Sequence, residues 1–195
     1  MRLSFLPVVL ALAASASGCT YRTTPDPELS ARDIEWMAQI PSAQEDKVYA
    51  RYLVDDPTGE APGTITVDTK QRLLFLTLAD KKAMRYGVAV GDEAYGWSGT
   101  ARVDHKAEWP DWNPPAEMIA RWPHVHKTAG GPANPLGARA LYLFEGNKDT
   151  LYRIHGTNEP EKIGQAVSSG CIRMRNIDVV DLYNRVQPGA KVVIK

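Results

Sequence analysis

A histidine and a cysteine, His155 and Cys171, lie close together near the C-terminus of the chain. A free thiol is mostly protonated near neutral pH, so it needs a base within reach before it can attack an acyl carbon. Histidine suits this task because its pKa lies near ambient pH. The intervening chain is long enough for a strand end, a loop and a return turn, so the two side chains can meet. The sequence therefore predicts a cysteine nucleophile with a histidine base.

The elements that must position these two residues follow from their neighbours. Gly170, directly before Cys171, allows a tight and even left-handed turn. Such a turn can direct the amide N–H groups of Gly170 and Cys171 at one point, as an oxyanion hole for a tetrahedral intermediate. His155 ends the strand-like run 150–154, which we predict to pair with the alternating run 138–144. That pairing would hold the base on a rigid element.

Other interpretations of these residues exist. A lone cysteine is commonly a small buried hydrophobe, and a lone histidine a hydrogen-bonded polar residue. In an oxidising compartment, Cys171 could also form a structural disulfide with the second cysteine, Cys19. We favour catalysis because the pairing, the flanking glycines and the signs of export described below occur together.

The sequence around both residues resembles a known family. It is similar to the active-site motif of the L,D-transpeptidases with a YkuD-type catalytic domain, in the ErfK/YbiS-like subgroup. The motif comprises His155-Gly156-Thr157 and Ser168-Ser169-Gly170-Cys171-Ile172-Arg173-Met174. Further similar stretches are 130–137, 138–144 and 189–194, so the resemblance covers about residues 60–195. It implies a mainly β fold, a YkuD-like β-sandwich or mixed sheet with one or two short helices.

The resemblance also implies a substrate, the stem tetrapeptide of peptidoglycan. Cys171 would attack the carbonyl of its third residue and release D-alanine, while His155 accepts and returns the proton. An amine would then resolve the thioester, from a second stem (a 3–3 crosslink) or from an envelope protein such as an outer-membrane protein or lipoprotein. Water as acceptor would make the chain an L,D-carboxypeptidase or hydrolase. A non-catalytic peptidoglycan-binding lipoprotein is a further alternative.

Further site residues follow from the same resemblance. Gly156 has no side chain, so only its carbonyl could orient the imidazole. Many relatives have a histidine where this chain has Ser169, to which we assign a supporting role. For substrate binding we predict Asn134, Tyr152 and Arg173. Asn134 could instead hydrogen-bond backbone in the loop beside the active site, and Arg173 could either bind a carboxylate by a two-pronged contact or form a structural ion pair. The chemistry requires no metal or organic cofactor.

The N-terminus has the features of an export signal. A short basic start precedes the apolar run 3–16, which is too short to span a bilayer comfortably. Small residues then lead to Cys19, as in a bacterial lipobox. We therefore predict a signal peptide at 1–18 and lipidation of Cys19, which would hold the protein in the periplasm or cell envelope by a lipid anchor alone. Ordinary cleavage near residues 14–16 would leave Cys19 as a free thiol.

Two segments follow the predicted export signal. Residues 19–45 are polar and contain several prolines, which indicates a flexible linker, and residues 46–195 would form the catalytic domain. Within the linker we predict a short helix near 30–37, with Ser30 as its cap and Asp33 three residues on.

Composition and patterning complete the prediction. The 195 residues include 23 basic and 23 acidic ones, so nothing points to nucleic-acid binding, and fifteen glycines and fourteen prolines favour a β-rich fold with many turns. Residues 91–115 appear as loop. Strands are predicted at 48–54, 64–68, 71–78, 83–90, 138–144, 150–155 and 191–195, and helices at 114–122 and at 176–186, the latter capped by Asn176 or Asp178.

Two clusters of rings invite functional interpretations. Trp97, Trp109 and Trp112 could stack on sugars, but we favour a role in covering the core or lining a cleft. His124 and His126 could share one face of a strand as metal ligands, but no third ligand lies nearby in the sequence, so we predict ordinary loop histidines.

Overall fold

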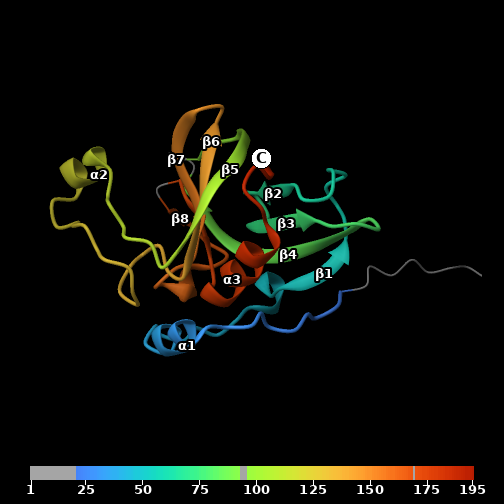
Figure 1. Ribbon diagram of the computed structural model, residues 1–195, viewed down its shortest axis with the longest axis horizontal. Coiled ribbons are helices and arrows are strands. Elements are labelled where there is room, and N and C mark those ends of the chain that lie inside the picture. Colours follow the sequence, from blue (N-terminus) through green and yellow to red (C-terminus); the bar gives the residue numbers. More distant parts are fainter. Residues whose placement is uncertain (1–20, 93–95, 169) are drawn as a thin grey trace, which may run out of the picture.

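The computed structural model describes residues 21–92, 96–168 and 170–195 (Figure 1). The predicted signal peptide, Cys19 and Ser169 lie outside the described residues. Within the described ranges, no helix combines the length and the apolar character needed to span a bilayer.

One mixed sheet forms most of the protein (Figure 1), which confirms the predicted mainly β fold. The strands follow the order β1-β4-β3-β2-β10-β5-β6-β7-β9, and β9 also pairs with β4, so the sheet closes on itself. Their bounds are β1 (Tyr52–Asp55), β2 (Ile65–Asp68), β3 (Leu73–Thr77), β4 (Lys82–Gly91), β5 (Gly99–Glu108), β6 (Arg139–Glu145), β7 (Lys148–His155), β8 (Ala166–Ser168), β9 (Ile172–Met174) and β10 (Lys191–Ile194).

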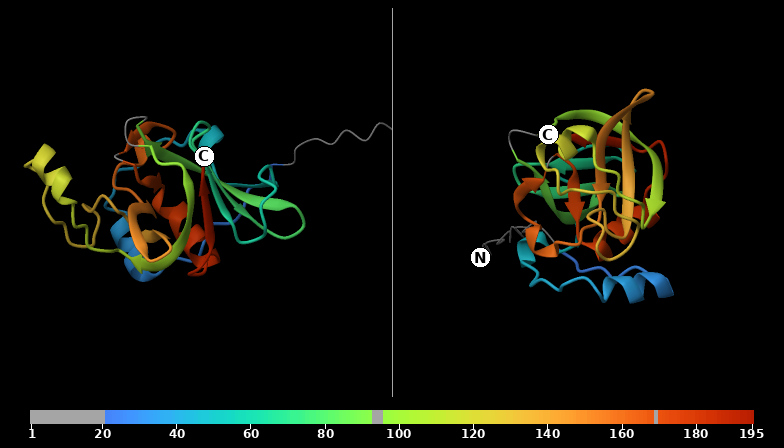
Figure 2. Two further views of the ribbon diagram at one scale, coloured as in Figure 1. Left: turned by 90° about the horizontal axis from the view of Figure 1, so that it is seen from above. Right: turned by 90° about the vertical axis from the view of Figure 1, so that its left-hand side faces the viewer.

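The described residues contain three α-helices, each within or close to a segment where the sequence predicted one. They are α1 (Ala31–Met37), α2 (Ala116–Arg121) and α3 (Asn176–Arg185), with short 3₁₀ turns η1 (Lys47–Tyr49) and η2 (Pro160–Lys162). α2 sits on an arm that projects away from the sheet in Figure 1 and in the left view of Figure 2. α3 contributes Val179, Val180 and Leu182 to the core, where they pack with buried residues of the closed sheet. Burying each such side chain stabilises the fold by about 1.5–3 kcal/mol.

The strand β5 corrects the prediction that residues 91–115 form loops. Ala101 and Val103 are buried in the first half of the strand, but the second half is largely polar and partly exposed. The apolar alternation is therefore too short to indicate a strand from the sequence. Pairing with β6 on one side and β10 on the other stabilises it instead.

The start of α3 also differs from the prediction, because neither Asn176 nor Asp178 caps it. The N-cap residue is Arg175, and it makes no side-chain cap hydrogen bond. The Asn176 side chain points to the strand ends instead. Its Oδ1 accepts from the Ala138 amide at 2.9 Å and the Thr157 amide at 3.2 Å, and its Nδ2 donates to the Thr157 carbonyl at 2.7 Å. Asn176 therefore ties α3 to the chain that follows His155.

The part of the predicted linker that the structure describes, residues 21–45, packs against the domain. The helix α1 has the predicted capping box between Ser30 and Asp33, and it lies against the outside of the sheet (Figure 2). Arg22 pairs with Leu53 in an isolated bridge at the edge of the sheet. The segment differs from a free tether because its polar side chains find buried partners on the domain. Asp33, for example, is only 1% exposed.

Candidate active site

A cleft of about 760 Å³ contains both predicted catalytic residues, His155 and Cys171. One wall is formed by the arm that carries α2, including Trp112 and Met118. The opposite side is formed by β7 and by the turn before β9, including Tyr152. The cleft is thus built from segments that are far apart in the sequence, and it gives the thiol access from solvent.

Strand pairing brings the two residues together. His155 is the last residue of β7, where it pairs antiparallel with Ala140 of β6 and parallel with Arg173 of β9. Cys171 directly precedes β9. Because β9 is the strand that closes the sheet between β7 and β4, both residues are held at the point of closure. The predicted pairing of 150–155 with 138–144 is confirmed.

The His155 imidazole is buried and has a defined tautomer. Its Nδ1 lies 2.6 Å from the carbonyl oxygen of Gly156. A carbonyl only accepts hydrogen bonds, so Nδ1 carries the proton and Nε2 is left as a base. Burial, and next the positive charge of Arg173, lower the pKa of His155 from 6.5 to about 3, although the Gly156 carbonyl acts in the opposite direction. The imidazole is therefore neutral at neutral pH.

Cys171 is a free, half-buried cysteine. Burial raises the pKa of its thiol above the ordinary 9.0, and nearby Arg153 and Arg173 offset part of that rise. The thiol donates weakly to the Leu151 carbonyl oxygen at 3.8 Å. Leu151 has a left-handed φ of 64°, which a bulky residue adopts only under constraint. The resting site thus pairs a neutral thiol with a neutral imidazole.

The turn before the nucleophile contains a residue that the sequence analysis missed. Gly170 has a φ of 118°, a conformation that favours glycine, and its amide donates to Ser168 Oγ at 3.2 Å. Ser168 is buried, and its hydroxyl donates to the Cys171 carbonyl at 2.6 Å. The Gly170 amide, predicted to face an oxyanion, is therefore engaged by Ser168 in this state. The sequence could have indicated Ser168, because the motif itself places a side-chain hydroxyl at this position, close to the nucleophile.

Comparison with known proteins identifies the family. A sequence model described as "L,D-transpeptidase catalytic domain" (YkuD) matches residues 62–194, which is most of the chain. This chain belongs to the YkuD family of L,D-transpeptidase catalytic domains. The resemblance seen in the motifs is thereby confirmed.

Individual relatives agree with this family. The Escherichia coli K12 protein named "Probable L,D-transpeptidase YbiS" is 32% identical over 139 residues. The match covers 67% of this chain but 43% of YbiS, so this chain spans less than half of that relative.

Solved structures show the same fold. L,D-transpeptidase 3 from Mycobacterium tuberculosis matches with a TM-score of 0.55 at 14% identity, covering 69% of this chain and 62% of that one. A Brucella melitensis structure, titled as a probable carnitine operon oxidoreductase, is 48% identical with a TM-score of 0.53, covering 77% of this chain and 96% of that one. The name oxidoreductase belongs to the Brucella protein and is not extended to this chain.

The three residues predicted to bind substrate occupy different places in this L,D-transpeptidase domain. Asn134 is completely buried, and its amide group bonds only to backbone, donating to the carbonyls of Pro110, Thr128 and Ala129 and accepting from the Leu136 amide. It therefore organises the base of the arm, and burial removes it from contact with a substrate. Tyr152 and Arg173 do line the cleft.

Both cleft residues also have structural partners. Tyr152 stacks on Trp97, with ring centroids 5.4 Å apart. Arg173 donates to Glu159 at 2.9 Å, so it forms the structural ion pair that was one of its two predicted roles. Of the other tryptophans, Trp109 is buried in the core and Trp112 lines the cleft.

His124 and His126 lie on the surface of the arm. Within the described ranges, no group of three or more His, Cys, Asp or Glu side chains is arranged to hold a metal ion.

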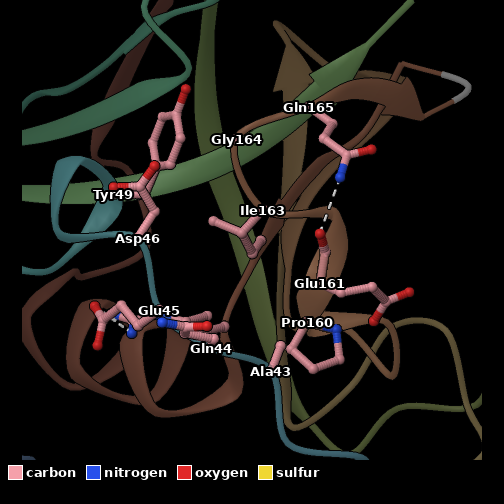
Figure 3. Close-up of a pocket in the computed structure, with 11 residues that line it drawn as sticks. Ala43, Gln44, Glu45, Asp46, Tyr49, Pro160, Glu161, Ile163, Gly164 and Gln165 are labelled. Carbon is pink, nitrogen blue, oxygen red and sulfur yellow. Dashed lines mark hydrogen bonds and ion pairs between the residues drawn. The ribbon is translucent and has the colours of Figure 1, made fainter.

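A second, smaller pocket of about 290 Å³ lies between the N-terminal segment and the loop before β8 (Figure 3). The N-terminal residues 43–49 form one side and the loop 160–165, which leads into β8, forms the other. Glu45 pairs with Arg175, and the Tyr49 ring packs so closely on Gly164 that a Cβ there would lie 2.2 Å from it. At this pocket the N-terminal segment packs against the loop before β8 and the residue that follows β9.

Proposed function

We propose that this protein is a peptidoglycan L,D-transpeptidase in which Cys171 is the nucleophile and His155 its general base. The observation that supports this most is the shared cleft, which contains a free thiol and an imidazole whose Nδ1–H is held by the Gly156 carbonyl. The hydrogen bond to Gly156 leaves Nε2 unprotonated and fixes the direction in which it accepts a proton.

The first half-reaction forms a thioester. As the Cys171 sulfur attacks the carbonyl carbon of the third stem residue, the thiol proton moves to His155 Nε2. The resulting oxyanion is stabilised by backbone amides of the turn, for which the Gly170 amide must exchange its bond to Ser168. The C–N bond to D-alanine then breaks, and His155 returns the proton to the departing amine. Because the resting thiol and imidazole are both neutral, the proton must move from Cys171 to His155 as the sulfur attacks.

The second half-reaction transfers the acyl group. An acceptor amine attacks the thioester carbon, His155 takes a proton from its nitrogen, the C–S bond breaks, and the proton returns to the thiolate. We propose a second stem peptide as acceptor, giving a 3–3 crosslink, with an envelope-protein amine as the alternative. Water in the same position would give carboxypeptidase activity. We propose that Arg173, which lines the cleft and also pairs with Glu159, attracts the carboxylates of such peptides.

We also propose that the chain is exported and anchored by a lipid on Cys19. The basic start, the apolar run 3–16 and the small residues before Cys19 support this. Because residues from Arg22 onward contact the domain, the anchor would hold the domain close to the membrane. Metabolic labelling with an alkyne fatty acid should mark the wild type and leave a Cys19→Ser variant unlabelled. Equal labelling of both would contradict lipidation.

The enzymatic proposal is tested on purified muropeptides. We expect the wild type, incubated with disaccharide-tetrapeptide, to release D-alanine and to form 3–3 dimers that mass spectrometry detects. Cys171→Ala should form none. Release of D-alanine without dimers would favour the carboxypeptidase alternative, and binding without any turnover would favour the non-catalytic one. Dimers formed by Cys171→Ala would refute the assignment of the nucleophile.

A further inference from the structure

The helix α1 precedes the region that matches the family model, yet its Asp33 is among the most heavily bonded side chains in the protein. The Asp33 carboxylate accepts both ends of the Arg139 guanidinium at 2.8 Å each. It also accepts Trp109 Nε1–H at 2.8 Å and the amide and hydroxyl of Ser30 at 3.2 and 2.8 Å. The carboxylate is thus buried and fully satisfied, and its partners belong to the catalytic domain.

One of these partners leads directly to the catalytic base. Arg139 begins β6, and its carbonyl accepts the Gly156 amide at 3.0 Å. The Gly156 carbonyl in turn accepts His155 Nδ1–H at 2.6 Å. Asp33 therefore fixes the side chain of Arg139. The backbone carbonyl of Arg139 accepts from Gly156, and the carbonyl of Gly156 orients the imidazole. The Arg139 fork is fixed in two directions at once, because Nη1 also donates to the Ala138 carbonyl at 2.8 Å.

The other partner lies at the base of the arm. Trp109 donates its backbone amide to the same Ala138 carbonyl at 2.8 Å, which closes the neck between β5 and β6. The Trp36 ring of α1 packs edge-on against the Trp109 ring, with centroids 5.1 Å apart. Asp33 therefore holds both ends of the arm that forms one wall of the cleft.

We infer that Asp33 is a positioning residue for the reaction proposed above, fixing the His155–Gly156 turn through Arg139 and the neck of the arm through Trp109. This inference rests on the proposed function. It assigns the N-terminal segment a role in catalysis, in addition to any role in export or attachment. The second pocket supports it, because Glu45 of the same segment pairs with Arg175 directly after β9, and Tyr49 packs on Gly164 before β8 (Figure 3). The N-terminal segment therefore contacts the chain before β8 and after β9, the two strands that flank the catalytic turn, as well as the residues that hold the base.

The test compares Asp33→Asn with a matched control on the same helix. Arg32 forms an exposed ion pair with Glu108 at 2.9 Å and lies 5.6 Å from the centre of the Trp36 ring. Arg32→Gln therefore removes charge interactions of α1 but leaves the hydrogen bonds of Asp33 in place. Full-length proteins are compared well below their unfolding temperatures, where circular dichroism shows each to be folded. The two readouts are the acylation rate at saturating tetrapeptide and the nitrogen-15 NMR signals of the His155 ring, assigned with a His155→Gln variant.

We expect Asp33→Asn to lower the acylation rate at least about tenfold, as misplacement of a base does, and to shift the His155 Nδ1 signal. Arg32→Gln should match the wild type in both. Wild-type acylation and unchanged His155 signals in folded Asp33→Asn would show that the contact is structural only, and would overturn the inference.

Two further outcomes remain informative. If Asp33→Asn does not fold, Arg139→Lys replaces it in the test, because lysine keeps the charge but loses the two-pronged contact. The acylation rate of Arg139→Lys should fall, and its His155 Nδ1 signal should shift, as expected for Asp33→Asn. An Arg139→Lys protein that matches the wild type in both readouts would overturn the inference. If the wild type does not acylate at all, the proposed function fails. The NMR readout needs no substrate, so it still decides whether Asp33 positions the imidazole.

Discussion

Gly156 and Asn176 provide a quantitative test of how the base is held. A Cβ at Gly156 would lie 2.2 Å from Asn176 Oδ1 and 2.9 Å from the Ala138 nitrogen. Asn176 cannot simply move away, because its amide group makes three hydrogen bonds to the backbone of Ala138 and Thr157. Gly156→Ala must therefore displace the Asn176 side chain.

The expected cost follows from what is displaced. Two backbone amides lose their acceptor, at about 1–2 kcal/mol each, and overpacking adds about 1–3 kcal/mol. We expect Gly156→Ala to lower the free energy of unfolding by about 3–7 kcal/mol. Asn176→Ala should lower it by about 2–4 kcal/mol, since it loses the same hydrogen bonds without the clash.

The double variant is decisive, because Asn176→Ala removes the atom with which the new methyl group collides. Urea unfolding followed by tryptophan fluorescence should therefore show that Gly156→Ala costs at least about 1 kcal/mol less in the Asn176→Ala background than in the wild type. Equal costs in the two backgrounds would refute the reasoning that Asn176 holds the His155–Gly156 turn.

Three further predictions concern titration and the turn. Because the pKa of His155 is lowered to about 3 by burial, the folded state binds fewer protons than the unfolded state between pH 3 and 6.5, so stability should fall as the pH drops through this window. Urea unfolding should show wild type losing about 3 kcal/mol more than His155→Gln between pH 7 and 4, and parallel pH curves would contradict this. Hydrogen bonds from Arg139, Ser30 and Trp109 outweigh burial and hold the pKa of Asp33 well below its usual 3.8. The stability lost in Asp33→Asn should therefore be largest at neutral pH and shrink as the pH falls below 3.8. A loss of stability that does not change with pH would contradict this prediction. Ser168→Ala removes the hydroxyl that joins the Gly170 amide to the Cys171 carbonyl. The variant should stay folded but acylate about tenfold more slowly in stopped-flow assays. An unchanged acylation rate would show that the turn does not need the Ser168 hydrogen bonds.

Much of the fold could be predicted from periodicity, because most strands have a buried face of apolar residues. β2, β3, β4, β6, β7 and β10 lie within or close to their predicted ranges. β1 is shorter than predicted, because the first residues of the run 48–54 form the 3₁₀ turn η1. β5 could not be predicted, since its stability comes from two neighbouring strands and not from its own alternation.

The candidate site was only partly predictable, for a similar reason. Cys171 and His155 belong to local motifs, so their types and spacing indicated them. Ser168 and Asn176 act through hydrogen bonds to backbone groups, and such partners are set by the tertiary fold. The packing of α1 depends on a buried ion pair between Asp33 and Arg139, which no local pattern around either residue indicates. The prediction of a flexible segment there followed from its polar composition alone.

The reactivity of Cys171 is the central claim, and trapping the acyl-enzyme tests it most directly. The wild type is mixed with disaccharide-tetrapeptide, quenched in acid within seconds, and measured by intact-protein mass spectrometry with peptide mapping. We predict a mass increase equal to the donor minus D-alanine, located on Cys171, absent from Cys171→Ala and strongly reduced in His155→Gln. Release of D-alanine with no adduct on Cys171, or an undiminished adduct in His155→Gln, would contradict the account.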